Sequence, residues 1–99
     1  MDNHNIVQLK KEFEGRAEVK GFRFTQIVKT EKACLYRVQF NDEMYWEVFK
    51  IKVDTIPLAD QLYERYPTAT AFGKWAWSFR SCKKAFAKLR ELEFGEEDL

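Results

Sequence analysis

The chain is poor in the residues that most often carry chemistry or cross-links. Its 99 residues include one histidine, two cysteines, two prolines and four glycines. A single histidine leaves no His/Cys cluster for a metal ion, and the Gly-rich phosphate loops and nucleophile motifs of common enzymes are absent. We therefore expect no metal, no cofactor and no catalytic residue, that is, a protein that is not an enzyme. One enzymatic alternative stays open, a carboxylate-only hydrolase or nuclease that uses Glu47 and Asp54.

The chain also lacks a large excess of either positive or negative charge, and it lacks long apolar runs. Seventeen basic residues against sixteen acidic ones give a net charge of +1, which does not indicate a globally basic nucleic-acid binder. No stretch approaches the roughly 18 consecutive apolar residues of a membrane span. The first residues, MDNHN, lack the basic and apolar blocks of a signal peptide, and two cysteines are too few for a disulfide scaffold. We expect a cytoplasmic protein without a membrane segment.

Large aromatic side chains are what the chain has in abundance. Nine Phe, four Tyr and three Trp residues give it an aromatic content of 16%. Such side chains fill the core of a small protein compactly. No internal repeat or linker is visible, so residues 1–99 are predicted to form a single domain. Cys34 and Cys82 both fall on apolar faces and are expected to be buried thiols.

The sequence pattern predicts an α+β fold. Alternation of apolar and polar residues indicates an antiparallel sheet of about four strands. The predicted strands are residues 22–29, 34–40, 44–53 and 75–79. Asn41-Asp42 is a hairpin-turn signal between the second and third strands. A C-terminal helix begins after Ser81, carries the apolar stripe Cys82, Ala85, Phe86, Leu89 and Leu92, ends at Gly95, and packs on one face of the sheet.

Three other segments carry less regular patterns. Residues 5–14 are predicted to form a short N-terminal helix, with Ile6, Leu9 and Phe13 on one face. Residues 44–53 are apolar on both parities, which fits either a central strand covered on both faces or a bulge near Val48. Residues 55–66 fit either a short helix or a loop.

Trp75 and Trp77 lie two residues apart in a predicted strand and so point to the same side. The C-terminal helix follows directly after this strand. We therefore expect both tryptophans to be buried beneath the helix.

Several segments resemble those of a known group of proteins. They are GFRF at residues 21–24, LYRV at 35–38, YWEVFK at 45–50 and, most specifically, FGKWAW at 72–77, which precedes the helix that opens at Ser81. In these segments the chain resembles small uncharacterised proteins of gut Bacteroidetes and their mobile elements. The resemblance implies a shared fold and an accessory role, and it brings no activity, ligand or catalytic residue with it.

Two surfaces are candidates for binding a partner. Residues 80–90 hold five basic residues and no acid, whereas residues 91–99 hold five acids. The basic stretch suits phosphate contacts, unless its lysines pair with the acids that follow. The second surface is the sheet face opposite the helix, where basic and aromatic residues interleave as in surfaces that stack single-stranded nucleic acid. The residues expected there are the basic Arg23, Lys29, Arg37, Lys50 and Lys52, with one or more of Tyr45, Trp46 and Phe49. Alternatively, the N-terminal helix or a second copy of the chain covers that face.

Together these features predict a non-catalytic interaction module that binds another protein, or a second copy of itself, through its sheet face. The alternative is a nucleic-acid-binding accessory protein that uses the basic C-terminal helix and the basic and aromatic sheet face. The net charge of only +1 favours a protein partner. The candidate partner-binding residues are Arg23, Arg37, Trp46, Lys50, Lys52, Arg80, Lys83, Lys84 and Lys88.

Overall fold

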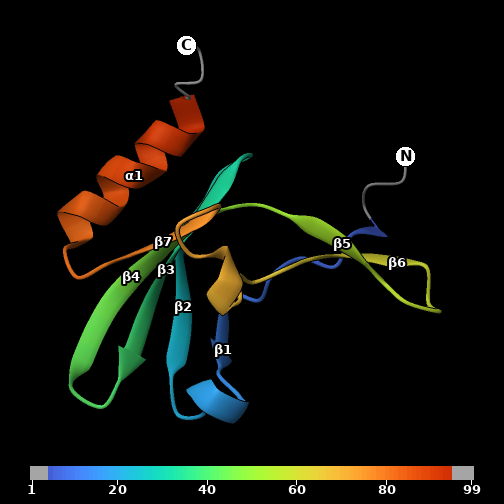
Figure 1. The fold of residues 1–99 in the computed structure, drawn as a ribbon, viewed down its shortest axis with the longest axis horizontal. Helices are drawn as coiled ribbons and strands as arrows, with labels where there is room; N and C mark the ends of the chain where they lie inside the picture. Colours follow the sequence, from blue (N-terminus) through green and yellow to red (C-terminus); the bar gives the residue numbers. More distant parts are fainter. Residues whose placement is uncertain (1–4, 95–99) are drawn as a thin grey trace.

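The computed structural model describes residues 5–94 and has an α+β architecture (Figure 1). Five antiparallel strands form the main sheet in the order β1-β2-β3-β4-β7, and β5 and β6 form a separate antiparallel hairpin. The strands are β1 (Glu12–Glu14), β2 (Arg23–Lys29), β3 (Ala33–Phe40), β4 (Glu43–Lys50), β5 (Val53–Ile56), β6 (Gln61–Glu64) and β7 (Ala76–Phe79). The helix α1 (Cys82–Phe94) packs on one face of the main sheet, and η2 (Ala17–Val19) and η3 (Ala69–Ala71) are short 3-10 turns. The predicted fold class is thus confirmed.

The turns that join the central strands follow local sequence chemistry. Asn41 has a φ of 56° and closes the β3–β4 hairpin, as its turn signal predicted. The Thr30 side chain organises the β2–β3 turn, since its Oγ1 accepts a hydrogen bond from the Ala33 N–H at 3.1 Å. The Ser81 hydroxyl caps α1 by accepting the Lys84 N–H at 3.2 Å, which confirms the predicted start of the helix.

The main sheet has a buried cluster on each side. We call the side beneath α1 the helix face and the other side the far face. On the helix face, Leu35 and Val48 pack against Leu89 of α1. On the far face, Tyr36 and Phe49 belong to a second cluster that residues from 66–76 help to cover. The chain therefore builds two thin apolar layers around one sheet.

The structure explains why the third predicted strand, residues 44–53, is apolar at both its odd and its even positions. β4 lies between β3 and β7 and is covered on both faces, and its register with β3 is continuous, without a bulge at Val48. Of the two alternatives, the central strand covered on both faces is confirmed. The predicted end at Val53 is wrong, because β4 ends at Lys50 and Val53 begins β5.

The predicted N-terminal helix over residues 5–14 is wrong. Val7 bridges Tyr63 of β6, and residues 12–14 form β1 along the edge of β2. The Tyr36 hydroxyl donates to the Lys10 carbonyl at 2.7 Å, and Phe13 stacks on Phe24 with ring centroids 4.7 Å apart. A helix of ten residues is marginal in water, whereas these long-range contacts hold the same segment extended.

Residues 55–66 are neither a helix nor a simple loop, so both alternatives for this segment are wrong. Most of the segment belongs to the β5–β6 hairpin, which extends away from the main sheet (Figure 1). Leu58 and Asp60 at its tip have φ values of 69° and 54°. The β-branched residues Val53, Thr55 and Ile56 favour a strand, although Leu58, Leu62 and Tyr66 repeat every four residues as in a helix.

The expectation for the tryptophans holds only in part: Trp77 lies beneath the helix but is half-buried rather than buried. Trp77 pairs with Val48 on the helix face, and Lys88 of α1 places its Nζ 4.1 Å from the centre of the Trp77 ring. Trp75 instead packs against the far-face cluster, because it precedes β7 and the alternation of that strand does not extend to it. Cys34 is buried as expected, but Cys82 is exposed at the first turn of α1, so that prediction is wrong. The helix end at Gly95 and the acids at 96–98 lie outside the described residues.

No helix within residues 5–94 has the length and apolar content needed to cross a membrane.

Candidate functional site

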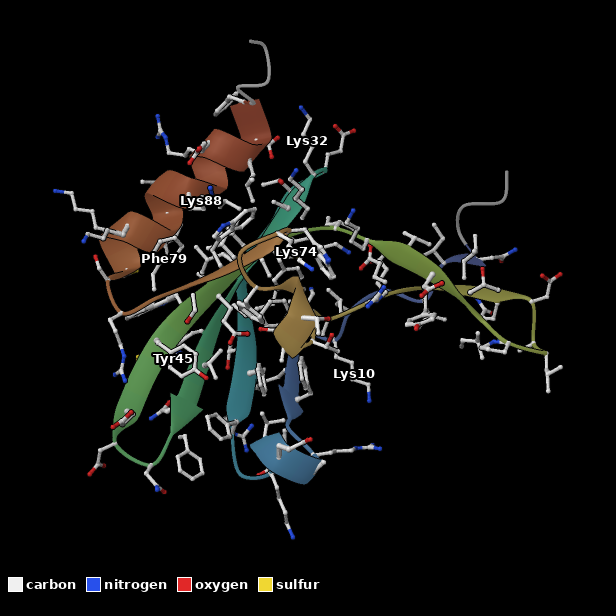
Figure 2. The ribbon with its side chains drawn as sticks, in the orientation of Figure 1. Lys10, Lys32, Tyr45, Lys74, Phe79 and Lys88 are labelled. Atoms are coloured by element: carbon white, nitrogen blue, oxygen red, sulfur yellow. The ribbon has the colours of Figure 1, made fainter. Side chains whose placement is uncertain are left out.

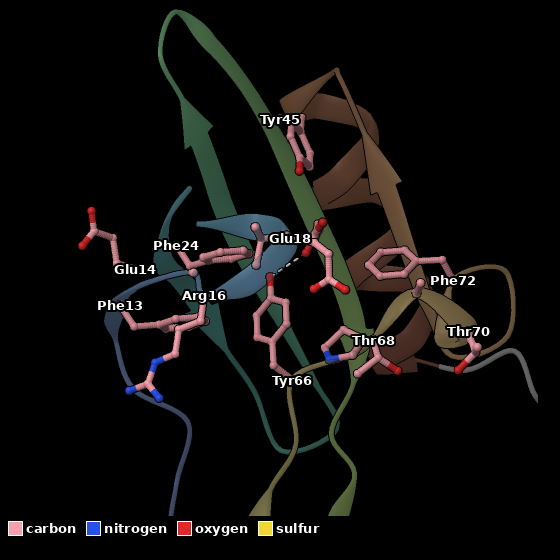
Figure 3. Close-up of a pocket in the computed structure, with 15 residues that line it drawn as sticks. Phe13, Glu14, Arg16, Glu18, Phe24, Tyr45, Tyr66, Thr68, Thr70 and Phe72 are labelled. Carbon is pink, nitrogen blue, oxygen red and sulfur yellow. Dashed lines mark hydrogen bonds between the residues drawn. The ribbon is translucent and has the colours of Figure 1, made fainter. Parts of the chain in front are cut away.

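A pocket of about 850 Å³ lies on the far face of the sheet (Figure 3). Its floor comes from the sheet, one wall from the turn after β1, and the other wall from the segment that follows β6. Aromatic rings and charged side chains both contribute to the lining: Phe13, Phe24, Tyr45, Tyr66 and Phe72 supply rings, and Glu14, Arg16, Glu18 and Glu47 supply charge. We call this the far-face pocket.

A second, shallower hollow of about 470 Å³ adjoins the pocket. Tyr45, Glu47, Ala69 and Phe72 line both hollows, and the second continues to Arg80. The two hollows together therefore form an elongated depression along the far face rather than one compact cavity.

The central polar feature of the pocket is the side chain of Glu47 on β4. This residue is only 9% exposed, yet its neighbours on the strand are the apolar Trp46 and Val48. Its Oε1 accepts a hydrogen bond from the Tyr66 hydroxyl at 2.7 Å, which Figure 3 marks with a dashed line. Oε2 has no hydrogen-bond partner among the described residues and is not sealed from the surface. One carboxylate oxygen is therefore held, and the other remains available.

Burial raises the pKa of the Glu47 carboxyl above its ordinary value of 4.5, and the hydrogen bond from Tyr66 partly opposes this rise. The pKa of the Tyr66 hydroxyl is raised well above 10, first by burial and then by the nearby carboxylate. Tyr66 thus keeps its proton and remains a donor. No lysine or arginine within residues 5–94 forms an ion pair with Glu47.

Tyr66 is fixed in place by the rings around it. Its ring centroid lies 4.8 Å from that of Phe49, 5.1 Å from Tyr36, 5.2 Å from Phe24 and 5.5 Å from Phe13, always at a steep angle between the planes. Edge-to-face packing of this kind is favourable and restricts the ring. The hydroxyl that holds Glu47 is therefore preorganised by the far-face core.

The wall after β1 depends on a close approach of two backbone segments. A Cβ on Gly15 would lie 2.2 Å from the Val19 carbonyl oxygen, so only glycine fits there. Ala17 also adopts a left-handed φ of 55° in this turn. The turn places Glu14, Arg16 and Glu18 around the pocket, all three exposed. Counting Glu47, the lining thus holds three carboxyl groups and one guanidinium group.

The predicted basic and aromatic surface forms only in part on the sheet face opposite the helix: Lys29, Tyr45 and Phe49 lie on that side. The strand register places Arg23, Arg37, Trp46 and Lys50 on the helix face, so their predicted side is wrong. Trp46 is half-buried there, beside the cluster under α1. The error arises because both parities of β3 are apolar: the even positions, such as Tyr36, looked like the face for the helix, but α1 packs on the odd ones, such as Leu35.

The other predicted partner-binding residues are spread over the molecule, and most of them have partners in the chain. Lys52 lies over Trp75 with its Nζ 5.7 Å from the ring centre. Arg80 pairs with Glu43 at 3.3 Å, and Lys88 pairs with Glu91 at 3.4 Å. Lys83 and Lys84 are exposed on α1. Figure 2 shows how widely basic side chains are dispersed, with labels on Lys10, Lys32, Lys74 and Lys88.

The far-face pocket therefore has little overlap with the residues that sequence reasoning selected. Of the nine candidates, Arg80 alone lines either hollow. Asp54, suggested as a carboxylate partner of Glu47, pairs with Arg65 at 3.7 Å and does not line the pocket. Tyr66 was missed altogether. The signal for Glu47 was an acid between the apolar Trp46 and Val48 in the middle of a central strand, which is an unusual place for a charge.

No group of three or more His, Cys, Asp or Glu side chains within the described part of the chain is arranged to hold a metal ion. No family model, curated protein or solved structure matches the chain, and the resemblance to the gut Bacteroidetes proteins stays a prediction.

Proposed function

We propose that the protein is a cytoplasmic, non-catalytic interaction module that binds a segment of another protein in the far-face pocket. The observation that carries this proposal is the Glu47 carboxyl group, buried among aromatic rings and paired with no lysine or arginine of residues 5–94. Burying an ionisable group costs free energy unless a partner compensates it. A buried carboxyl group with this cost, and with no ion pair in the part of the chain that the structure describes, is better explained by a ligand than by a contribution to stability.

The shape of the site favours a chain segment over a compact small molecule. The pocket and its neighbouring hollow share four lining residues, so a partner can run past Glu47 toward Arg80. The rings of Tyr45 and Phe72 lie along this path and offer apolar contact for its side chains. Aromatic residues of this kind dominate the energetics of many protein interfaces.

Two features support binding rather than catalysis. General acid–base chemistry needs a second group that converges with the acid on a reacting atom. The Tyr66 hydroxyl is committed to Glu47, and the remaining lining carboxylates, Glu14 and Glu18, belong to exposed residues. The charge of the pocket also disfavours nucleic acid, because carboxylates repel phosphates.

The experiment fills the pocket with a bulky residue. A random peptide library is selected against the wild-type protein, and the enriched peptides are measured by fluorescence anisotropy. Ala69→Trp places a large ring in the lining of both hollows, whereas Ala87→Trp makes the same change on the exposed surface of α1. We expect peptide binding to be lost at least tenfold in Ala69→Trp and retained in Ala87→Trp, with circular dichroism verifying that both variants fold.

Three outcomes would overturn the proposal. The first is that no peptide is enriched on the wild type relative to Ala69→Trp, and the second is equal binding to both tryptophan variants. The third is loss of peptide binding in the double variant Lys83→Glu, Lys84→Glu. The last result would point to the basic surface of α1 and to the nucleic-acid alternative. A concentration-dependent mass in sedimentation, lost in Ala69→Trp, would identify a second copy of the chain as the occupant.

A further inference from the structure

We infer that the partner group recognised in the far-face pocket is the side chain of a lysine, with its ammonium group at Glu47 and its methylene chain against the aromatic rings. This inference rests on the proposed function and adds the chemistry of the ligand. It combines three observations: a carboxylate with one oxygen available, rings around it, and no lysine or arginine of residues 5–94 paired with that carboxylate.

The available oxygen fits an ammonium group better than a guanidinium group. Tyr66 occupies Oε1 of Glu47 at 2.7 Å, which leaves Oε2 as the free acceptor. An arginine gains most when both carboxylate oxygens accept its planar fork, and that arrangement is impeded here. A lysine ammonium is a compact charge that needs only one strong acceptor.

The rings suit the rest of a lysine side chain. Tyr45 and Phe72 line both hollows, and Phe24 and Phe13 line the pocket. The methylene groups of lysine pack on apolar surface, while the faces of aromatic rings attract a nearby cation. Within the structure itself, Lys88 over Trp77 at 4.1 Å shows a lysine–ring contact of this type.

The surrounding charge adds to the attraction. Glu14 and Glu18 belong to the lining, and neither forms an ion pair within the described residues. Among the described residues, Arg16 is the one basic residue in the lining of the pocket, and it is exposed. The resulting excess of negative charge favours the approach of a cationic side chain and disfavours an acidic one.

The test uses small probes that copy side chains. n-Butylammonium represents lysine, n-propylguanidinium represents arginine, and 1-pentanol is a neutral molecule of similar length. Each probe is titrated into isotope-labelled protein, and NMR shifts are followed at Tyr45, Tyr66 and Phe72. We expect n-butylammonium to give saturable shifts there and to bind more tightly than either of the other probes.

Glu47→Gln removes the charge while its amide oxygen still accepts the hydrogen bond from Tyr66. We expect this variant to bind n-butylammonium at least about tenfold more weakly, since hydrogen bonds to charged groups are the stronger class. Ala69→Trp is measured alongside it and is expected to abolish the shifts. The control Ala87→Trp is expected to leave them unchanged.

The inference is overturned if 1-pentanol or n-propylguanidinium binds as tightly as n-butylammonium, if Glu47→Gln binds n-butylammonium as the wild type does, or if the shifts fall on α1. A selected peptide supplies the separate check. If replacing its lysines with norleucine leaves its affinity for the pocket unchanged, the lysine inference fails, but the proposed protein-binding function remains.

Discussion

Removal of the hydroxyl from Tyr66 eliminates one interaction of the far-face pocket, the hydrogen bond to Glu47. Tyr66→Phe keeps the ring that packs between Phe49, Tyr36, Phe24 and Phe13, so the far-face core is preserved. It removes only the donor that lies 2.7 Å from Oε1 of Glu47. The change therefore isolates the hydrogen bond from the aromatic packing.

The expected free energy of the hydrogen bond between Tyr66 and Glu47 depends on whether Glu47 is ionised. A hydrogen bond to a charged group contributes about 1.5–3 kcal/mol, and one between neutral groups contributes about 0.5–1.5 kcal/mol. Burial raises the pKa of Glu47 above 4.5, so the carboxyl is mostly protonated at pH 4 and is ionised well above its folded pKa. The coupling between Tyr66 and Glu47 should thus be larger at pH 8 than at pH 4. The total stability of such a domain is about 5–15 kcal/mol, so the difference is measurable.

The assay is a double-mutant cycle. The wild type, Tyr66→Phe, Glu47→Leu and the double variant are unfolded in urea at both pH values, and the coupling free energy is calculated, because leucine cannot accept the hydrogen bond from Tyr66. Glu47→Gln is unfolded alongside them. The unfolded carboxyl loses its proton at a lower pH than the folded one. The wild type therefore loses stability as pH rises from about 4.5 through the raised folded pKa, and Glu47→Gln should lack this loss. A coupling near zero at both pH values, or a wild type that gains stability over this window because of Glu47, would refute the account of the pair.

Three further predictions concern the fold around the site. Cys82 should react at once with a thiol reagent, whereas Cys34, fully buried with its pKa raised by burial to about 12, should react only on unfolding; equal rates would contradict the two-layer core. Gly15→Ala should lower the free energy of unfolding by about 1–3 kcal/mol in urea titrations, because the new Cβ would lie 2.2 Å from the Val19 carbonyl oxygen. An unchanged or higher stability would contradict this and would show that the turn adjusts without cost. Leu89→Ala should lower the free energy of unfolding by about 2–5 kcal/mol in the same assay, since this side chain is 5% exposed and lies on the side of α1 that packs on the sheet. Lys83→Ala on the exposed surface of α1 should change stability by less than about 0.5 kcal/mol, and similar effects of the two changes would contradict this packing of the helix.

Local signals in the sequence predicted the elements that depend on nearby residues. The alternation around Tyr36 marked β3, Asn41 marked its hairpin and Ser81 marked the start of α1. Each of these features arises from residues within a few positions of one another, where turn and capping chemistry are strongest.

The features that were missed depend on contacts between distant segments. Residues 5–14 become extended because β2 and β6 offer hydrogen-bond partners, which no periodicity within the segment reveals. The sequence could not predict which face of the sheet α1 covers, because Leu35 and Tyr36 make both sides of β3 apolar. The far-face pocket forms only when Tyr66 packs onto the sheet 19 positions after Glu47, so the sequence showed an isolated acid but not the site around it.

The central claim is that a partner binds at the carboxyl group of Glu47. The most direct measurement is the ¹³C NMR signal of that carboxyl group, assigned with Glu47→Gln and followed as a pocket-selected peptide is added to saturation. The account predicts that this signal shifts with the binding curve of the peptide, together with signals of Tyr66, while those of Lys83 and Lys84 on α1 stay in place. A Glu47 signal that remains fixed at saturating peptide would contradict it.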